Sequence, residues 1–219
     1  MNVENEVRYY YSLDQENKIV EYMKTIKELT YKGKFYEKTV QYDHPQKENS
    51  FYSKEIDARF RLRINKNEQS EKMMISYKRR LGDTHINEIN KEQEVEITLK
   101  AEEHDNIIYI LEDVLKMKLI ESYERYRYVF ANNDVEIAID VYPFIIAFEI
   151  ENKSEYKNPQ IVISEYLNKF NLKIEDSYKL SWDDKYSELC RNQNIKQYNI
   201  VEFDKEMPKY ENHIFEINQ

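Results

Sequence analysis

Charged residues of one sign recur at alternate positions along this chain, with apolar residues between them. In the segment DARFRLRI (57–64), Arg59, Arg61 and Arg63 alternate with hydrophobic side chains. Successive side chains of a β-strand point to opposite faces, so one face of this segment is apolar and the other carries only guanidinium groups. Like charges side by side repel each other and cost stability unless counter-charges face them. The pattern therefore predicts a fold that brings strands of opposite charge together.

Further segments of the chain show the same pattern. The acidic ones carry Glu4 with Glu6, Glu94 with Glu96, Glu136 with Asp140, and Glu149 with Glu151, and the basic ones carry Lys78 with Arg80 and Arg125 with Arg127. An ordinary sheet with one solvated face would explain any single pair, but such a face normally mixes both signs with uncharged polar residues. A closed antiparallel barrel with these faces turned inward would let opposite charges meet across a water-filled interior.

The hydrophobic periodicity places the elements of such a fold. Period-two alternation predicts strands at about 3–11, 34–42, 57–65, 71–80, 93–99, 122–130, 135–142 and 144–151. Helical spacing predicts helices over 12–29, 102–118, 158–170 and 182–193, the first with Ser12 or Asp14 as its N-cap. Antiparallel strands interrupted by a few helices indicate the α+β class, here an eight-stranded antiparallel β-barrel with flanking helices.

Composition limits where the chain acts and what it binds. A net charge of −9 and a pI near 5.2 argue against general binding to nucleic acid or to anionic membranes. Cys190 is the only cysteine, so no intrachain disulfide can form, and Glu4 and Glu6 lie where a signal peptide would be apolar. We expect a cytoplasmic monomer or homodimer with no double-stranded nucleic acid or membrane as partner.

The common phosphate-binding and hydrolase motifs are missing from the sequence. Its two glycines, Gly33 and Gly82, cannot build a P-loop or a dinucleotide-binding loop, and no GxSxG segment is present. Phosphate would therefore have to be bound by side chains, for which the planar fork of arginine is well suited. Clustered carboxylates suit Mg²⁺ or Mn²⁺, so carboxylates and arginines in one enclosure predict a polyphosphate site.

Six segments resemble, in order, the strand motifs of the CYTH superfamily, the triphosphate tunnel metalloenzymes. They are ENEVR (4–8), FRLRI (60–64), MISYKRR (74–80), EQEVEI (92–97), YERYRYVF (123–130) and IDVYPFIIAFEIE (139–151). A later segment, SYKLSWDDKYSEL (177–189), resembles the C-terminal part of many members. The resemblance implies a tunnel domain over residues 1–192, including the C-terminal helices, and a C-terminal extension over 193–219.

The resemblance also implies roles for individual residues. The metal ligands would be Glu4, Glu6, Asp140, Glu149 and Glu151. Phosphate oxygens would be bound by Arg59, Arg61, Arg63, Lys78, Arg80, Arg125, Arg127 and Lys185, with Lys179 as the alternative to Lys185. The catalytic residues would be Glu4, Glu94, Glu96 and Arg8. Arg8 and Arg125 stand where the family usually has lysine, and because arginine does not give up its proton, Arg8 is expected only to bind charge.

The expected function is hydrolysis of a triphosphate, inorganic or organic, with Mg²⁺ or Mn²⁺ as cofactor. The family also includes class IV adenylyl cyclases, so cyclic AMP formation from ATP is an alternative. A non-catalytic nucleotide- or polyphosphate-binding module and a protein-binding scaffold are further alternatives. No segment predicts a purine pocket, and Trp182, the single tryptophan, is expected to pack in the core.

Overall fold

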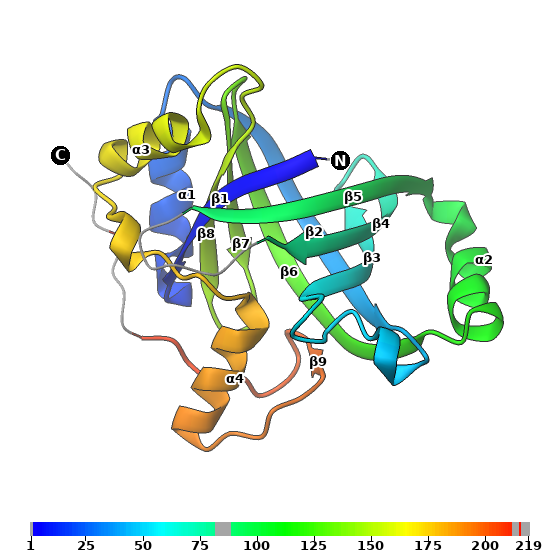
Figure 1. Cartoon of the computed structure of the whole chain (residues 1–219). Coiled ribbons are helices and arrows are strands. Elements are labelled where there is room, and N and C mark those ends of the chain that lie inside the picture. The colour runs from blue at the N-terminus through cyan, green and yellow to red at the C-terminus, as the bar shows by residue number, and fades with distance from the viewer. Residues whose placement is uncertain (1, 82–88, 212–214, 216–219) are drawn as a thin grey trace.

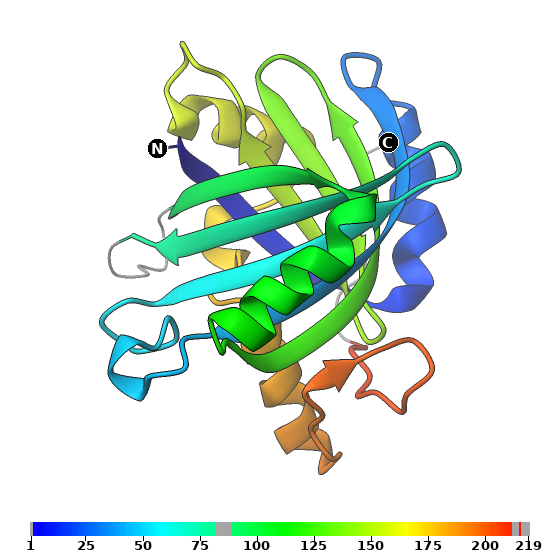
Figure 2. The ribbon, with the colours of Figure 1, turned by 90° about the vertical axis from the view of Figure 1, so that its right-hand side faces the viewer.

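A computed structural model describes residues 2–81, 89–211 and 215, and it contains a closed antiparallel β-barrel (Figures 1 and 2). The eight barrel strands follow the chain as β1 (Asn2–Tyr11), β2 (Thr30–Asp43), β3 (Ala58–Lys66), β4 (Glu71–Arg80), β5 (Asn90–Lys100), β6 (Lys118–Ala131), β7 (Val135–Val141) and β8 (Ile146–Asn152). Around the barrel they are ordered β2-β3-β4-β5-β1-β8-β7-β6, and pairing of β6 with β2 closes the ring. The predicted eight-stranded α+β barrel is confirmed.

The strand register places opposite charges next to each other on the inner face. Arg8 of β1 is paired with Glu149 of β8, and Lys78 of β4 with Glu94 of β5. At these positions an inner side chain meets a counter-charge on the neighbouring strand, which offsets the repulsion between like charges along each strand. At other positions the register pairs like charges, as in Glu4 with Glu92, Glu6 with Glu151 and Arg59 with Lys78.

Two helices cover the outer face of one side of the barrel. They are α1 (Glu16–Lys24) and α3 (Pro159–Lys169), which lie together in Figure 1. Ile19 and Met23 of α1 and Val162 of α3 are buried in one core cluster with Phe148 and other outward residues of β6, β7 and β8. The apolar outer faces of these strands are covered by the helices, and their removal from water stabilises this packing.

A third helix, α4 (Trp182–Gln193), closes part of one end of the barrel. The Ser181 N–H and Oγ both donate to Asp184 Oδ2, at 3.0 and 2.6 Å, and this cap starts the helix. Its buried face packs on a cluster of aromatic side chains that includes Tyr10, Tyr123 and Tyr142. These tyrosines are in phase with the charged inner residues of their strands, so the charged interior gives way to an aromatic core at this end.

The first two predicted helices differ from the structure in length and form. In place of the predicted helix over 12–29, a single 3-10 turn (Leu13–Gln15) precedes α1, and the N-cap of α1 is Gln15 rather than Ser12 or Asp14. After Lys24 the chain turns, and the Thr25 hydroxyl donates to the carbonyl of Tyr22 at 2.7 Å. Leu29 still reaches the core, which explains why its spacing looks helical.

The predicted helix over 102–118 is instead a 3-10 turn (Ala101–Glu103), a short α2 (His104–Ile108) and a π-helical stretch (Tyr109–Val114). It lies across β3 and β4 (Figure 2), where Leu111 packs on Leu62 and Met73. No helix among residues 2–81, 89–211 and 215 is long and apolar enough to cross a membrane.

The segment after α4 returns to the barrel. A two-residue strand, β9 (Ile200–Val201), pairs parallel with β6, and Val201 is buried. Phe215 packs among the core residues around α1. Of the predicted extension over 193–219, residues 212–214 and 216–219 lie outside the described residues.

The packing of the outer strand faces predicts a contrast between two aliphatic residues. Leu62 is 2% exposed beneath α2, whereas Ile97 on β5 is 56% exposed. Leu62→Ala should lower the free energy of unfolding by about 3 kcal/mol because it leaves a cavity. Ile97→Ala should change it by less than about 0.5 kcal/mol. Urea unfolding of both variants measures this, and equal losses would contradict the packing of the helical segment around Leu111 on Leu62.

Candidate functional site

The inner face of the barrel surrounds a cavity of about 350 Å³. Side chains from all eight barrel strands line it, and most of these are charged. Most of the residues predicted for the site are among them: Glu4, Glu6, Arg8, Arg59, Arg61, Arg63, Lys78, Arg80, Glu94, Glu96, Arg125, Arg127, Glu149 and Glu151.

Two predicted site residues do not line this cavity. Asp140 is completely buried in the barrel wall, where Arg125 Nη1 and Arg127 Nε each lie 2.6 Å from its carboxylate oxygens. Lys185 lies at a separate cavity outside the barrel, paired with Glu188 at 2.9 Å. Its ammonium group lies 5.3 Å from the centre of the Tyr178 ring. Asp140 is therefore paired with two arginines that themselves line the main cavity, whereas Lys185 is paired outside the barrel.

The basic residues of one wall form a continuous chain of ion pairs with buried acids. Arg125 lies between Glu37 and Asp140, at 2.6 Å from each. Arg127 continues the chain from Asp140 to Glu149, and Arg8 continues it from Glu149 to Glu6. Each guanidinium thus has a carboxylate on both sides, as buried charges require.

These contacts fix the charge of the buried acids. Burial alone would raise the pKa of Glu37, but Arg125 holds that pKa well below its ordinary value. Burial likewise opposes ionisation of Glu149, whose pKa is held low by Arg8 and Arg127. Both side chains therefore remain carboxylates at neutral pH.

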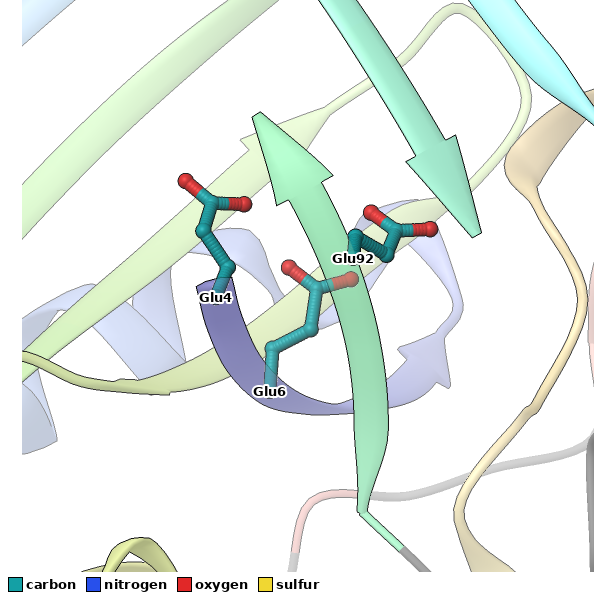
Figure 3. A group of neighbouring side chains, drawn as sticks. All are labelled: Glu4, Glu6 and Glu92. Atoms are coloured by element: carbon teal, nitrogen blue, oxygen red, sulfur yellow. The ribbon is translucent and has the colours of Figure 1, made fainter. Parts of the chain in front are cut away.

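A cluster of three glutamates adjoins the end of this chain, where β1 pairs with β5. Carboxylate oxygens of Glu4, Glu6 and Glu92 lie within 4.8 Å of one another (Figure 3). The Lys78 ammonium is placed among them, at 2.5 Å from Glu4, 2.9 Å from Glu92 and 3.7 Å from Glu6. Burial opposes ionisation of Glu4, but Lys78 lowers its pKa to about 2. The cluster thus already attracts one cation.

Three acids in or beside this cluster, Glu6, Glu94 and Glu151, have raised pKa values. Burial raises the pKa of Glu6 to about 7. Burial and the neighbouring Glu4 together raise the pKa of Glu94 to about 9 and that of Glu151 to about 8. Burial is the largest cause of each of these shifts, and neighbouring carboxylates add to it. An all-oxygen donor group with excess negative charge fits Mg²⁺ or Mn²⁺.

The structure adds two acids to those predicted, Glu37 and Glu92. Glu92 was missed although it extends the alternation of Glu94 and Glu96 by one step and lies in the quoted segment EQEVEI. Glu37 has no charged neighbour at i±2 on its own strand, where Phe35 and Thr39 flank it, so its sequence context carried no such signal.

Arg61 and Arg63 differ from the paired arginines of the wall. Among the described residues, Arg61 has no ion pair, and its Nε donates only to Gln41 Oε1 at a long 3.4 Å. Arg63 donates to Thr39 Oγ1 at 3.3 Å and reaches Glu37 only at 3.9 Å. Most of their donors are therefore available to an anion in the cavity.

Comparison with known proteins identifies the fold. No protein-family model matches the chain, and no curated protein matches its sequence. Among solved structures, a Pyrococcus horikoshii protein matches with a TM-score of 0.59 and 19% identity, over 83% of this chain and 98% of that one. HpAC1 from Hippeastrum, named as an adenylyl cyclase candidate with a dominant triphosphatase activity, matches with a TM-score of 0.55 and 12% identity, over 90% and 98%. An adenylate cyclase candidate from Vibrio parahaemolyticus matches with a TM-score of 0.59 and 17% identity, over 85% and 98%.

This chain has the closed eight-stranded antiparallel barrel fold of these solved structures. The charged cavity is the interior of this barrel, which we call the tunnel. At 12–19% identity the similarity establishes the fold, and the chemistry has to be argued from the tunnel's own side chains.

The ion-pair chain of the tunnel predicts how stability depends on pH. Glu37→Gln should lower the free energy of unfolding by about 3 kcal/mol at pH 7, because it leaves buried Arg125 with one carboxylate fewer. The pKa of Glu37 is depressed in the folded state, so its contribution is present above the ordinary value of 4.5 and is lost as pH falls below it.

Urea unfolding of wild type and Glu37→Gln at several pH values between 3 and 7 measures this dependence. The difference between the two proteins should shrink as the pH falls below about 4.5. Glu136→Gln is the matched control, because Glu136 lines the same tunnel and forms no ion pair among the described residues. A difference that stays constant down to pH 3 would contradict the assigned contact.

Proposed function

We propose that this protein is a divalent-metal-dependent phosphohydrolase that acts on a triphosphate, either inorganic tripolyphosphate or an organic triphosphate. The observation that carries the proposal is the division of one cavity into two sides. Arg61 and Arg63 offer unpaired guanidinium donors, and the cluster of Glu4, Glu6 and Glu92 offers carboxylate oxygens. A chain of phosphates with a bound divalent cation is complementary to both sides.

Glu4, Glu6 and Glu92 are the residues that would hold the metal. The Lys78 ammonium already lies between their carboxylates, which supports a cation site at this position. Glu94 and Glu151 lie beside it, and their raised pKa values mean that they hold protons at neutral pH until a bound cation favours their ionisation. A bound Mg²⁺ or Mn²⁺ would supply a Lewis acid that neutralises phosphate oxygens during transfer.

The remaining tunnel residues would act on the phosphates directly. Arg61 and Arg63 would bind phosphate oxygens and stabilise the charge that develops on the transferred group. Arg127 would be held in place for the same purpose by Asp140. Glu4, ionised at neutral pH, would accept a hydrogen bond from the attacking water. Arg8 remains charged and would serve to orient Glu6 and Glu149.

The metal assignment predicts a defined loss on mutation. Glu6→Gln and Glu92→Gln should each weaken Mn²⁺ binding by at least about tenfold, because each removes one charged oxygen ligand. Glu136→Gln, a tunnel acid outside the cluster, should change it by less than about threefold. Mn²⁺ titration followed by electron paramagnetic resonance measures this. Equal losses in all three variants would indicate a general charge effect and no metal site at the cluster.

The reaction itself is tested by product analysis. The protein should release orthophosphate from tripolyphosphate, ATP or thiamine triphosphate with Mg²⁺ or Mn²⁺, and EDTA should abolish release. Arg61→Lys keeps the charge but loses the planar fork of donors. The transition state should therefore lose about 1–3 kcal/mol of stabilisation, which is a fall in kcat/KM of roughly 5- to 150-fold.

Arg79→Lys, on the exposed face of β4, is the control and should be unaffected. Pyrophosphate and cyclic AMP formed from ATP faster than orthophosphate would support the cyclase alternative. Triphosphate binding without turnover would support a non-catalytic binding module. If no triphosphate binds, the result would support a protein-binding scaffold.

A further inference from the structure

One edge of β5 has no neighbouring strand over its second half. β1 pairs with β5 from Asn90 to Glu94, whereas β4 pairs with β5 as far as Lys100. In Figure 1, β5 accordingly continues past the start of β1, which lies at the end marked N. Among the residues that the structure describes, no strand pairs with the other edge of Val95–Lys100. Such an edge presents backbone N–H and C=O groups that are suited to pairing with another strand.

The side chains along this free edge, which we name the β5 edge (Val95–Lys100), are exposed on both faces of the strand. On the outer face Val95 is 43% and Ile97 56% exposed, although both are apolar. On the inner face Glu96 and Thr98 are exposed as well. Apolar side chains beside an open strand edge favour association with a further strand, which would remove them from water.

The β5 edge is complementary to itself in one antiparallel register. If Thr98 lies opposite Thr98 of a second copy, Glu96 lies opposite Lys100 and Ile97 lies opposite Leu99. Directly opposite residues of an antiparallel pair share a face, so this register keeps inner residues with inner ones and outer residues with outer ones. Threonine pairs, aliphatic pairs and opposite charges are all favourable across strands. By symmetry, the charged pair and the aliphatic pair each occur twice.

The neighbouring registers are less favourable. A shift by one residue would place the outer apolar residues beside the inner charged ones. A register centred on Ile97 would extend to Glu94, whose edge β1 already occupies. A register centred on Leu99 would oppose Glu96 to Glu102, which is a repulsive pair. Only the register centred on Thr98 satisfies both faces of the strand.

Both charges in this register lack a strong partner within the single chain. Glu96 lies opposite Ser76 of β4 and forms no ion pair among the residues that the structure describes. Lys100 lies opposite Lys72, a like charge, and its contact with Glu102 at 3.5 Å joins two exposed side chains. A carboxylate of a second copy beside Lys100 would offset the repulsion from Lys72. Because Glu96 also lines the tunnel cavity, the second copy would in turn place an ammonium group at the tunnel rim.

We propose that the β5 edge pairs antiparallel with the β5 edge of a second copy, centred on Thr98, so that one sheet continues through two barrels. The occupant is a second copy because an unrelated strand would leave Glu96 and Lys100 without counter-charges. An edge of this length makes a small interface of the weak, transient class, so we expect dimers at about 10–100 µM protein. Dilute protein, as used for unfolding, is monomeric, and Ile97 is then exposed.

Sedimentation equilibrium of the full-length protein, from about 1 µM to about 1 mM, measures this association. Wild type should show a monomer–dimer equilibrium within that range. Glu96→Lys and Lys100→Glu each put like charges opposite one another twice in the dimer, so each variant alone should dimerise at least about tenfold more weakly. Both side chains are exposed in the monomer, so the variants should fold, which circular dichroism checks.

A mixture of the two variants tests the register itself. In a mixed dimer the Glu96→Lys chain has ammonium groups at both positions and the Lys100→Glu chain has carboxylates at both, so each inner pair is again attractive. The mixture should therefore dimerise within about threefold of wild type. Glu48→Lys and Lys47→Glu are the matched controls. They change the net charge equally at exposed positions of the turn Lys47–Asn49, and each should dimerise like wild type on its own.

The possible results decide the proposal. A wild type that stays monomeric up to about 1 mM would overturn it, because even a weak edge pair would associate at that concentration. A dimer that neither Glu96→Lys nor Lys100→Glu weakens would show that a different surface associates. A mixture that associates no better than its separate components would contradict the register centred on Thr98. Equal weakening by the two control variants would indicate general charge repulsion, and the assigned contact would then be wrong.

Discussion

The fold depends on charge compensation inside the barrel. Seven charged side chains, from Glu37 through Arg125, Asp140, Arg127, Glu149 and Arg8 to Glu6, are linked by ion pairs of 2.5–3.2 Å that cross from β2 to β1. Without the carboxylates, three neighbouring guanidiniums would repel one another in a poorly hydrated interior. Without the guanidiniums, burial would drive the acids to bind protons. The two sets of residues therefore allow each other to stay charged.

The compensation of charge is uneven around the cavity, and the charges that lack full compensation form the candidate site. The wall with the ion-pair chain is nearly neutral, because each cation has acids on both sides. The cluster of Glu4, Glu6 and Glu92 has more acids than Lys78 can neutralise. The guanidinium of Arg61, in contrast, has no ion-pair partner among the described residues. A cavity that is short of cations on one side and short of anions on the other is complementary to a metal–polyphosphate complex. The same residues that stabilise the barrel thus limit what it can bind.

The alternation of charge and the order of the motifs were sufficient to predict the barrel and most of the cavity lining. Period-two patterning depends only on which face of a strand is enclosed, so it survives in the sequence of each strand. The partners of each charge were not predictable in the same way. Asp140 was expected at the metal, yet the register of β7 with β6 pairs it with Arg127. That register is a tertiary property that alternation within one strand does not specify.

The helices show where local patterns give less information. Residues 25–29 keep helical spacing because Ile26 and Leu29 face the core, although the chain there turns. Lys185 was placed in the tunnel by resemblance, but the direction of α4 puts it against Tyr178 and Tyr210 instead. Ile26 and Leu29 could face the core from a helix or from a turn, and Lys185 could lie inside or outside the tunnel. Packing against distant segments selected one of them, and no short window of sequence contains that information.

Arg8 illustrates how one departure from the family pattern is explained by geometry. Its Nε donates to Glu149 at 2.5 Å, its Nη2 to Glu6 at 2.8 Å and its Nη1 to the carbonyl of Leu180 at 3.0 Å. A lysine has a single nitrogen at the end of its chain and could not reach three acceptors in these directions. The backbone carbonyl of Arg8 also accepts from the Tyr178 N–H at 2.7 Å. Arg8 therefore connects the acids of the tunnel to the segment that leads into Trp182 and Asp183.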